Sequence, residues 1–374
     1  MASSASELAA LLPRELSALP LLGTGALSEV RLLARPNGLP PLALKATRKP
    51  LLAFTQQIDR LVAEHRVLQA TCAAECPSSL ARFVGALHDA ERVYLFSEAV
   101  LAHGTQSVDL RQLLDARARL PPATRSLPGA AVARIADGLF GALRHLHGRR
   151  FAHRDVKPDN LVISTDGGAV LIDLGHSAAL PTDGVSRLRS LVGTEAYMAP
   201  ELLARRDHGC EVDCWAAGVT LFELLHGEPP FGADECAGWL VRALMEPAAA
   251  EERVAQRLGA GSRSDAAALL ASCLVVDPTR RADAQTAADD PWLRRFADAQ
   301  DGAAAALLEA AARAHNVASA SVDEEEAAWA KAEKEEVDAQ ANVLWQRNHE
   351  RWRLSFEPFG TLLAVERGDA DVHR

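Results

Sequence analysis

The spacing of hydrophobic and polar residues changes near residue 98 and divides the chain into two kinds of pattern. Before that point apolar residues come in short runs that predict β-strands, at residues 21–33, 41–45, 83–88 and 92–97, with one helical period between them at residues 56–70. After it helical periods dominate, as in residues 130–148, whose apolar positions are Val132, Ile135, Leu139, Phe140, Leu143 and Leu146. The pattern therefore predicts a strand-rich first part and a helical second part.

The two ends of the chain follow different patterns. Residues 1–16 are small, polar and Ala-rich, and are interpreted as a leader. Residues 297–374 are helix-prone, with acidic residues early and basic residues late, which suits the helix dipole; the candidate packing residues are Trp329, Val337, Val343, Leu344, Trp345 and Trp352. The basic aromatic stretch from Trp345 to Phe359 has the character of a calmodulin target, but a segment that docks on its own domain is the favoured interpretation.

Composition narrows the class of protein. Of 374 residues 48% are hydrophobic, so a full core can form, and the net charge of −10 argues against nucleic acid as the main partner. Six cysteines without the tight pairs of zinc sites are expected to be buried or idle thiols. No apolar run approaches the ~20 residues of a membrane span. The start of the chain carries Glu7 and Glu15 and no basic cluster, so no signal peptide is expected and the expected compartment is the cytosol, with the nucleus as the alternative.

Residues 153–160, His-Arg-Asp-Val-Lys-Pro-Asp-Asn, concentrate chemically useful groups on one short segment. Asp155 has the chemistry to accept a proton from a hydroxyl, and Lys157 to neutralise charge on a group in transfer. Asn160 and the later Asp173 offer the hard oxygen ligands that Mg²⁺ prefers. Together these groups suit phosphoryl transfer; a polar surface loop between two buried strands is the alternative.

With Asp173-Leu174-Gly175 following it, this string resembles the catalytic loop and magnesium motif of the eukaryotic protein kinase family. The resemblance implies a two-lobed α+β fold, with a small antiparallel-sheet lobe at residues 17–98 and a larger helical lobe at residues 99–296. It also implies that Asp155, Lys157, Asn160 and Asp173 are catalytic, that Asn160 and Asp173 bind Mg²⁺, and that ATP is the phosphate donor.

The same resemblance implies a nucleotide site in the first lobe. Gly23 and Gly25 would let the backbone close over phosphates, although Ser28 stands where the family has a third glycine, and an ordinary hairpin is the alternative. Lys45 would hold phosphates and pair with Glu64, while Ser97 would be a small gatekeeper and Glu98 to Val100 the hinge. The full expected set is Leu22, Gly23, Gly25, Val30, Ala43, Lys45, Glu64, Ser97, Glu98 and Val100.

Further landmarks follow the catalytic string. Residues 193–201 resemble the end of a kinase activation segment, in which Thr194 would bond between Asp155 and Lys157. Three residues have implied structural roles: Asp213 would hold the backbone of the catalytic loop, and Glu201 would pair with Arg281. Ser190, three residues before Gly193 in a basic context, is the candidate activating phosphorylation site.

Lys157 and the Gly193-Thr194 pair resemble serine/threonine rather than tyrosine kinases, so the expected function is phosphorylation of protein hydroxyls. Residues 189–194 look most like the branch that includes cyclic-nucleotide-dependent and phosphoinositide-dependent kinases. A pseudokinase scaffold would lack a catalytic group, and a small-molecule kinase would lack the features at residues 199–201 and Arg281. This chain has all of them. Protein substrates are therefore the expected partners.

Overall fold

The computed structural model describes residues 5–71, 75–102, 104, 107–121, 124–182, 187–231, 266–297, 335–346 and 353–359, with short pieces between 246 and 258 and between 307 and 310. The chain forms two compact units. Unit 1 comprises residues 1–69, 82–99 and 323–374, and unit 2 comprises residues 70–81 and 100–322. The tail therefore groups with the strand-rich part of the chain.

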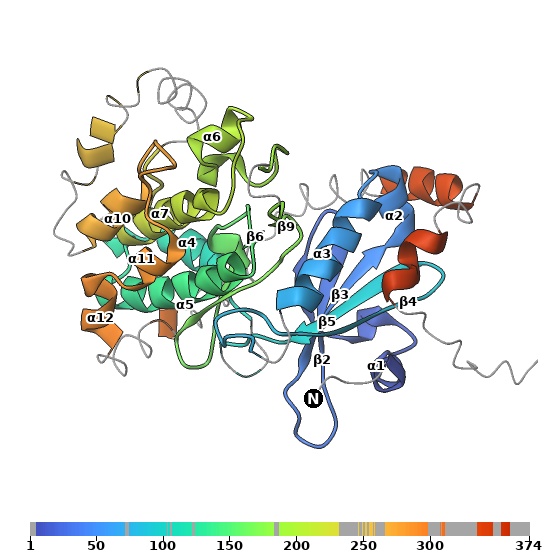
Figure 1. The fold of residues 1–374 in the computed structure, drawn as a ribbon. Helices are drawn as coiled ribbons and strands as arrows, with labels where there is room; N and C mark the ends of the chain where they lie inside the picture. Colours follow the sequence, from blue (N-terminus) through green and yellow to red (C-terminus); the bar gives the residue numbers. More distant parts are fainter. Residues whose placement is uncertain are drawn as a thin grey trace, which may run out of the picture. The chain divides into compact units, whose positions relative to one another are not determined.

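Unit 1 is built on a five-stranded antiparallel sheet with the strand order β1-β2-β3-β5-β4 (Figure 1). The strands are β1 (Leu21–Thr24), β2 (Ser28–Leu33), β3 (Leu42–Arg48), β4 (Phe83–His88) and β5 (Arg92–Glu98). Directly paired residues point to the same face of a sheet. Val30 pairs with Lys45, and Ala43 pairs with Ser97, so these four expected nucleotide-binding residues share one face.

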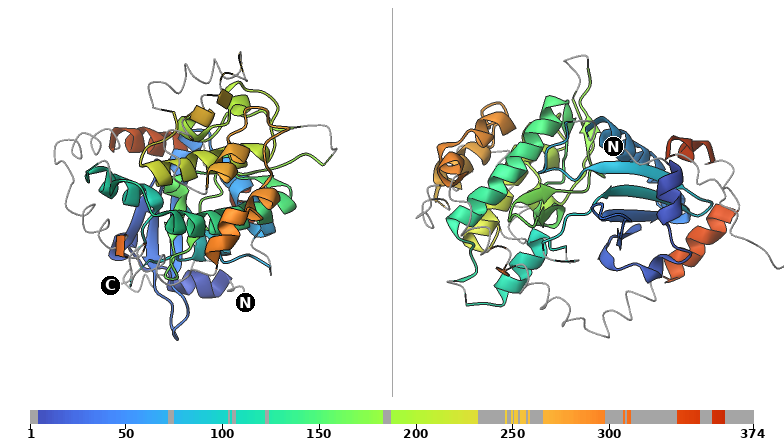
Figure 2. Two further views of the ribbon diagram at one scale, coloured as in Figure 1. Left: turned by 90° about the vertical axis from the view of Figure 1, so that its left-hand side faces the viewer. Right: turned by 90° about the horizontal axis from the view of Figure 1, so that it is seen from below.

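The opposite face of this sheet is apolar and is covered by the N-terminal segment. It presents Leu33, Leu42, Leu44, Ala46, Leu87, Tyr94 and Phe96, all buried. Helix α1 (Ala5–Leu11) lies beside β4 and inserts Leu8, which is 1% exposed, into this cluster (Figure 2). A Cβ at Gly85 would lie 2.6 Å from Leu8 Cδ1, so a side chain here would require the Leu8 side chain to move. The first residues thus form a layer of unit 1; η1 (Leu16–Ala18) follows.

Helices α2 (Lys49–Phe54) and α3 (Ile58–Thr71) and two pieces of the tail complete unit 1. Residues 335–346 are helical, and η5 (Arg353–Phe359) follows. The side chains of Phe356 and Phe359 are 1% and 2% exposed, as the docking interpretation predicts. Val343 was a wrong choice as a packing residue, because it is 51% exposed. Trp329 and Trp352 lie outside the described residues.

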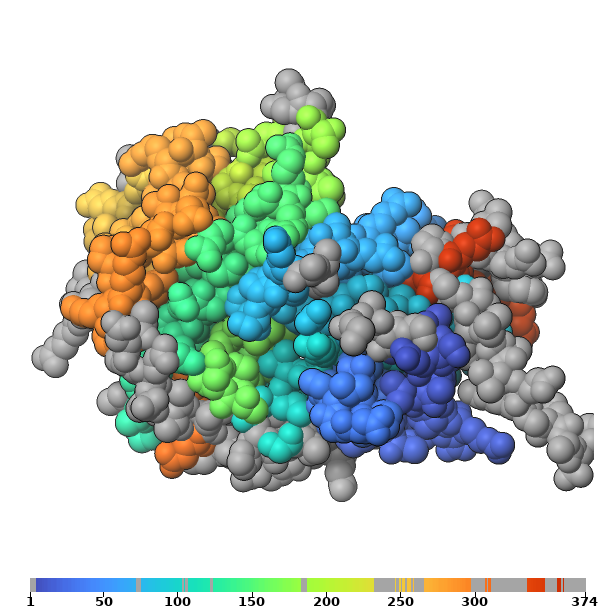
Figure 3. All heavy atoms as spheres, turned by 60° about the horizontal axis from the view of Figure 1, so that its bottom comes forward, coloured from blue at the N-terminus to red at the C-terminus, as the bar shows by residue number. Residues whose placement is uncertain are grey.

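The core of unit 2 surrounds the long helix α5 (Gly129–Gly148). All six apolar residues chosen from its periodicity are fully buried, at 0% exposure. Helices α11 and α12 pack against α5, and Figure 3 shows their orange atoms lying on its green ones. The other helices are α4 (Leu110–Ala118), α7 (Glu211–His226), α10 (Ala267–Cys273), α11 (Ala284–Ala288) and α12 (Pro291–Ala297). The predicted strand-rich and helical parts are confirmed.

Two short strand pairs bracket the candidate catalytic loop in unit 2. They are β6 (Phe151–Ala152) with β9 (Ala178–Ala179), and β7 (Leu161–Ile163) with β8 (Ala169–Leu171). The loop begins after β6 and reaches β7 through η3 (Pro158–Asn160). The later segment forms η4 (Glu195–Tyr197) and α6 (Pro200–Leu203). Residues 153–160 are thus anchored to a strand at each end.

Among the described residues the cysteines Cys76, Cys210, Cys214 and Cys273 are free thiols. Burial is the main reason that the pKa of Cys273 rises to about 12, so this thiol stays protonated and inert at neutral pH. Within the same residues, no helix is both long and apolar enough to cross a membrane.

Candidate active site

The backbone of the catalytic loop is held by the carboxylate of Asp213, which is completely buried at the start of α7. Asp213 Oδ2 accepts hydrogen bonds from His153 N and His147 Nε2, both at 2.8 Å, and Oδ1 accepts one from Arg154 N at 2.6 Å. Arg154 has a left-handed backbone conformation, with φ of 66°, which these bonds stabilise. Burial alone would raise the pKa of Asp213, but the bond from His147 and nearby positive charge outweigh it and hold the pKa below its ordinary range.

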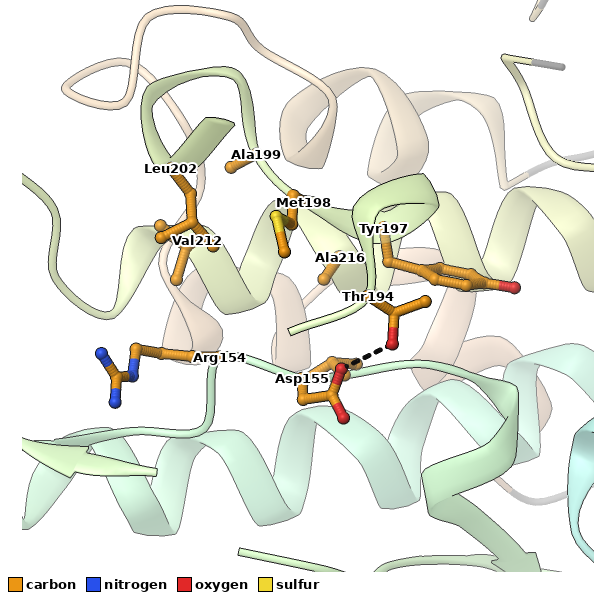
Figure 4. Close-up of a pocket in the computed structure, with 10 residues that line it drawn as sticks. Arg154, Asp155, Thr194, Tyr197, Met198, Ala199, Leu202, Val212 and Ala216 are labelled. Atoms are coloured by element: carbon orange, nitrogen blue, oxygen red, sulfur yellow. Dashed lines mark hydrogen bonds between the residues drawn. The ribbon is translucent and has the colours of Figure 1, made fainter. Parts of the chain in front are cut away.

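Thr194, on the segment before η4, connects Asp155 and Lys157 of the anchored loop, and Figure 4 shows its hydrogen bond to Asp155. The hydroxyl of Thr194 donates to Asp155 Oδ1 at 2.9 Å and accepts from Lys157 Nζ at 2.7 Å. Lys157 Nζ also lies 3.3 Å from Asp155 Oδ2. Asp155 is 7% exposed, and the contacts of its carboxylate with Thr194 and Lys157 fix its orientation. Such a carboxylate, with an ammonium beside it, can accept a proton while the cation offsets charge on a transferred group.

Asn160 and Asp173 are the two residues expected to bind a cation. The amide of Asn160 donates from Nδ2 to Asp155 O at 2.7 Å and Oδ2 at 3.1 Å, which leaves Oδ1 as the atom suited to a metal. Ile172 N donates to Asn160 O at 2.9 Å, so the chain before Asp173 is held to the loop. Asp173 is exposed and has a φ of 56°.

These oxygens fit Mg²⁺, which commonly takes one or two side-chain ligands and completes its shell with water and phosphate oxygens. No group of three or more His, Cys, Asp or Glu residues suited to a metal occurs in the described part of the chain. A cation here would therefore depend on phosphate oxygens from a ligand to complete its coordination.

Gly193 lets the segment that carries Thr194 approach the catalytic loop. Its φ is +107°, and a Cβ added there would lie 2.4 Å from the carbonyl oxygen of Arg154. Any side chain would therefore push Thr194 away from Asp155. The same approach encloses a small pocket that Figure 4 shows; its walls are Arg154, Asp155, Val156, Thr194, Tyr197, Met198, Ala199, Leu202, Val212 and Ala216.

Glu201 and Arg281 form a buried ion pair, with side chains 5% and 0% exposed. Arg281 Nη1 donates to Glu201 Oε1 at 2.6 Å, and Nη2 donates to Oε2 at 3.0 Å. The remaining donors bond to carbonyl oxygens, Nε to Val275, Nη1 to Glu211 and Nη2 to Val276. All five N–H groups of the guanidinium are used, so the pair fixes residues 201, 211 and 275–281 together.

Sequence reasoning missed a second polar network in unit 2. The hydroxyl of Tyr197 donates to Glu223 Oε2 at 2.7 Å, and Arg111 donates to Tyr197 and, at 3.0 Å, to Glu223 Oε1. Arg111 Nε also lies 3.7 Å from Asp159 Oδ2 on the catalytic loop. Burial and the charge of Glu223 raise the pKa of Tyr197, so the phenol stays a donor. The sequence around each residue does not predict these contacts, because they join three elements that are far apart in the chain, α4, η4 and α7.

In unit 1, Lys45 Nζ pairs with Glu64 Oε1 at 2.7 Å, and Glu64 is 5% exposed. Gly25 N donates to Ser28 O at 2.8 Å and closes the turn between β1 and β2, and a Cβ at Gly23 would meet no atom within 4 Å. The other expected nucleotide residues of unit 1 are Leu22, Val30, Ala43, Ser97 and Glu98; Val100 belongs to unit 2.

Ser190 is exposed, and its hydroxyl accepts a 2.6 Å hydrogen bond from Arg154 Nη1. The same arginine donates from Nε to His176 O at 2.8 Å. The two flanking basic residues are engaged with acids, Arg187 with Glu211 and Arg189 with Asp207 at 2.6 Å. Of the basic groups near Ser190, Arg154 is thus the one already directed at the hydroxyl.

Comparison with known proteins places this geometry in context. Residues 16–293 match the family model described as "Protein kinase domain". A "Calcium-dependent protein kinase 9" of Oryza sativa subsp. japonica is 37% identical over 59% of this chain and 36% of its own length. An "Aurora kinase" of Yarrowia lipolytica is 30% identical over 59% of this chain and 53% of its own. A "CBL-interacting protein kinase 4" of Oryza sativa subsp. japonica is 37% identical over 54% and 42%. The chain spans between a third and about half of the length of these relatives.

Proposed function

Since the chain belongs to the protein kinase family, we propose that it transfers the γ-phosphate of ATP to serine or threonine hydroxyls of protein substrates. The observation that carries the proposal is the group Asp155–Thr194–Lys157 on a loop held by Asp213. Phosphoryl transfer to an alcohol requires a positioned carboxylate with an ammonium beside it, and here a hydroxyl links the two groups. The names of the relatives, all protein kinases, support the same reaction.

In this proposal each residue has a separate role. Asp155 accepts the proton of the substrate hydroxyl, and Lys157 offsets charge on the transferred phosphoryl group. Asn160 and Asp173 hold Mg²⁺, which when bound neutralises phosphate charge. Lys45, oriented by Glu64, binds the α- and β-phosphates of the nucleotide. The remaining nucleotide contacts come from Leu22, Gly23, Gly25, Val30, Ala43, Ser97, Glu98 and Val100.

Two other functions compete with this one. A pseudokinase would bind partners without transfer, but every acid and lysine that the reaction needs is present, and each has a hydrogen-bond or ion-pair partner. A small-molecule kinase would have no use for a rigid platform at residues 193–201. The buried Glu201–Arg281 pair, which braces that platform, favours a protein substrate.

The test is phosphorylation of a peptide library by purified protein with Mg·ATP, with the phosphorylated residue identified. Asp155→Asn should lower the transfer rate about 10²- to 10⁴-fold while ATP binding stays nearly unchanged. Asp166→Asn is a matched control, because Asp166 lies on the β7–β8 turn in the same unit and bonds to Arg134. Transfer by the Asp155→Asn protein at the wild-type rate would contradict the assignment. ATP binding without transfer by wild type would indicate a pseudokinase, and transfer to small alcohols alone would indicate the second alternative.

A further inference from the structure

The tail of the chain docks on unit 1 through two aromatic residues, and each meets a histidine. Phe359 stacks on the ring of His65 from α3, with centroids 4.7 Å apart and planes 24° from parallel. The same histidine makes a T-shaped contact with Phe83 of β4, with ring centroids 5.6 Å apart. His65 is 2% exposed, and its Nδ1 is buried without a hydrogen-bond partner. The ring therefore sits in an apolar environment that the tail completes.

Phe356 covers the buried side chain of Lys49, whose ammonium contacts the second histidine, His88. The ammonium of Lys49 lies 4.5 Å from the Phe356 ring centroid, and the His88 ring lies 6.3 Å from the same centroid. Lys49 Nζ contacts His88 Nδ1 at 2.8 Å and Asp89 O at 2.5 Å. Because an ammonium only donates, acceptance by His88 Nδ1 requires a neutral imidazole with its hydrogen on Nε2; the same Nδ1 lies 3.3 Å from Asp89 O.

The helix at residues 335–346 gives the docked tail an anchor that does not involve histidine. Arg48, the last residue of β3, forms an ion pair with Asp338 and donates to Asn342 Oδ1 at 3.1 Å. Trp345 then contacts Phe356 edge-on at 6.1 Å, which links the helix to η5. The contact between Trp345 and Phe356 thus couples the helix to the residues that meet the histidines.

We propose that docking of residues 335–346 and 353–359 on unit 1 is sensitive to protons, and that protonation of His65 and His88 releases the tail. A protonated His65 would carry its charge between Phe83 and Phe359 with no acceptor at Nδ1. A protonated His88 could not accept from Lys49 and would place a second cation beside the ammonium. Both penalties are larger in the docked state, because release of the tail uncovers the two sites and lets water solvate the added charge.

The charges that surround the histidines support this direction. Burial lowers the pKa of His65; burial and then the charge of Lys49 lower that of His88, with Asp89 opposing. Burial also lowers the pKa of Lys49 to about 8, again opposed by Asp89, so Lys49 is charged at neutral pH.

The acids near the pocket are already engaged or exposed. Asp89 accepts from the amides of residues 91 and 92 and from the hydroxyl of Tyr94, and Glu64, next to His65, pairs with Lys45. Glu357 of η5 is exposed. Coulombic attraction to an acid is not among the causes that shift the pKa of His65, which burial alone lowers.

The sign of the pH effect follows from linkage. Both histidines have a lower pKa in the docked state than after release, where water relieves part of their burial, so docking is strongest above the pKa of the released state. As the pH falls below that value, the released state takes up protons first. The docking equilibrium constant then falls by up to about tenfold per pH unit for each histidine.

Hydrogen exchange of the full chain at pH 7.5 and pH 5.5, corrected for intrinsic rates, tests this inference. We expect peptides covering residues 335–346 to lose about ten- to a hundredfold of protection at pH 5.5, while α5 keeps its protection. In the double variant His65→Phe, His88→Asn, a ring that cannot titrate still stacks and an amide oxygen still accepts from Lys49. Its tail should keep protection within about threefold at both pH values. His226→Gln in unit 2 is the control and should respond like wild type.

A second measurement does not depend on the folding of the double variant. Histidine ring signals in an NMR titration should give His65 a pKa below 6.5 in wild type and a higher one in Phe359→Ala. The inference is overturned if the tail of wild type is equally protected at both pH values, or if the double variant loses its tail like wild type. Loss of protection in α5 together with the tail, or an unchanged His65 pKa in Phe359→Ala, would also overturn it.

Discussion

Replacing Glu201 by glutamine should destabilise unit 2 strongly, because it removes a charge from the buried pair with Arg281. The guanidinium of Arg281 is 0% exposed, makes five hydrogen bonds and lies over the ring of Trp215 at 5.2 Å. Glutamine keeps the shape of the side chain but presents one oxygen and one NH₂ group where two carboxylate oxygens stood. One N–H of Arg281 is then left facing a donor, and its full charge stays buried.

The size of the effect follows from that geometry. Removing one partner of a buried pair leaves an uncompensated charge and costs about 3–5 kcal/mol. For a unit of this size each kcal/mol lowers the melting temperature by about 2–4 °C, so we expect a drop of roughly 6–20 °C. Arg281→Lys should also be costly, since three ammonium donors cannot reach five acceptors.

The neighbouring arginine supplies a matched control. Arg280 pairs with Glu251 at 3.3 Å, but the side chain of Arg280 is 64% exposed. Glu251→Gln should therefore cost less than about 1 kcal/mol. Urea unfolding of wild type, Glu201→Gln and Glu251→Gln, followed by circular dichroism, measures the free energy of unfolding of each protein. A loss below 1 kcal/mol for Glu201→Gln, or one equal to that of Glu251→Gln, would refute the reasoning.

Three further substitutions test other parts of the molecule. Leu8→Ala should destabilise unit 1 by about 2–4 kcal/mol in the same unfolding assay, since Leu8 is 1% exposed, whereas Leu39→Ala, at a residue 48% exposed, should change stability by less than about 0.5 kcal/mol. Ser97→Met should weaken competition binding of adenine analogues with bulky substituents, and an unchanged affinity would show that Ser97 does not line the nucleotide site. Ser190→Ala should lower activity and remove a phosphate found by peptide mass analysis after incubation with Mg·ATP, because Arg154 already bonds to that hydroxyl. Full activity of Ser190→Ala would show that Ser190 is not an activating phosphorylation site.

The sequence was most informative where one local rule governs structure. The apolar period of residues 130–148 predicts α5 because a helix that is buried along its length must repeat its apolar residues at its own pitch. The same rule was wrong for Val343. Ala341 is fully buried, and a residue two positions later lies about 200° around the helix, which puts Val343 on the exposed face.

Contacts between distant segments could not be predicted in this way. The network of Arg111, Tyr197 and Glu223 joins residues up to 112 positions apart, so no local pattern predicts it. Helix α1 has one buried leucine among small residues, which is too little for a helical period, so its sequence favours a leader over a packed helix. The sequence predicts that the tail docks on its own domain. It does not predict the contacts with the histidines, because these depend on where α3 and β4 lie in unit 1.

The buried carboxylate of Asp213 has a consequence for how unit 2 assembles. His147 lies on α5 and Asp213 on α7, while the amides of residues 153 and 154 come from the chain between these helices. Taking a carboxylate out of water before its donors arrive would cost several kcal/mol. The packing of α5 against α7 and the closure of the loop must therefore occur together during folding. A folding intermediate in which the two helices are not yet packed would have no formed loop at residues 153–160. During refolding, the proposed transfer activity would therefore return only when α5 and α7 have packed.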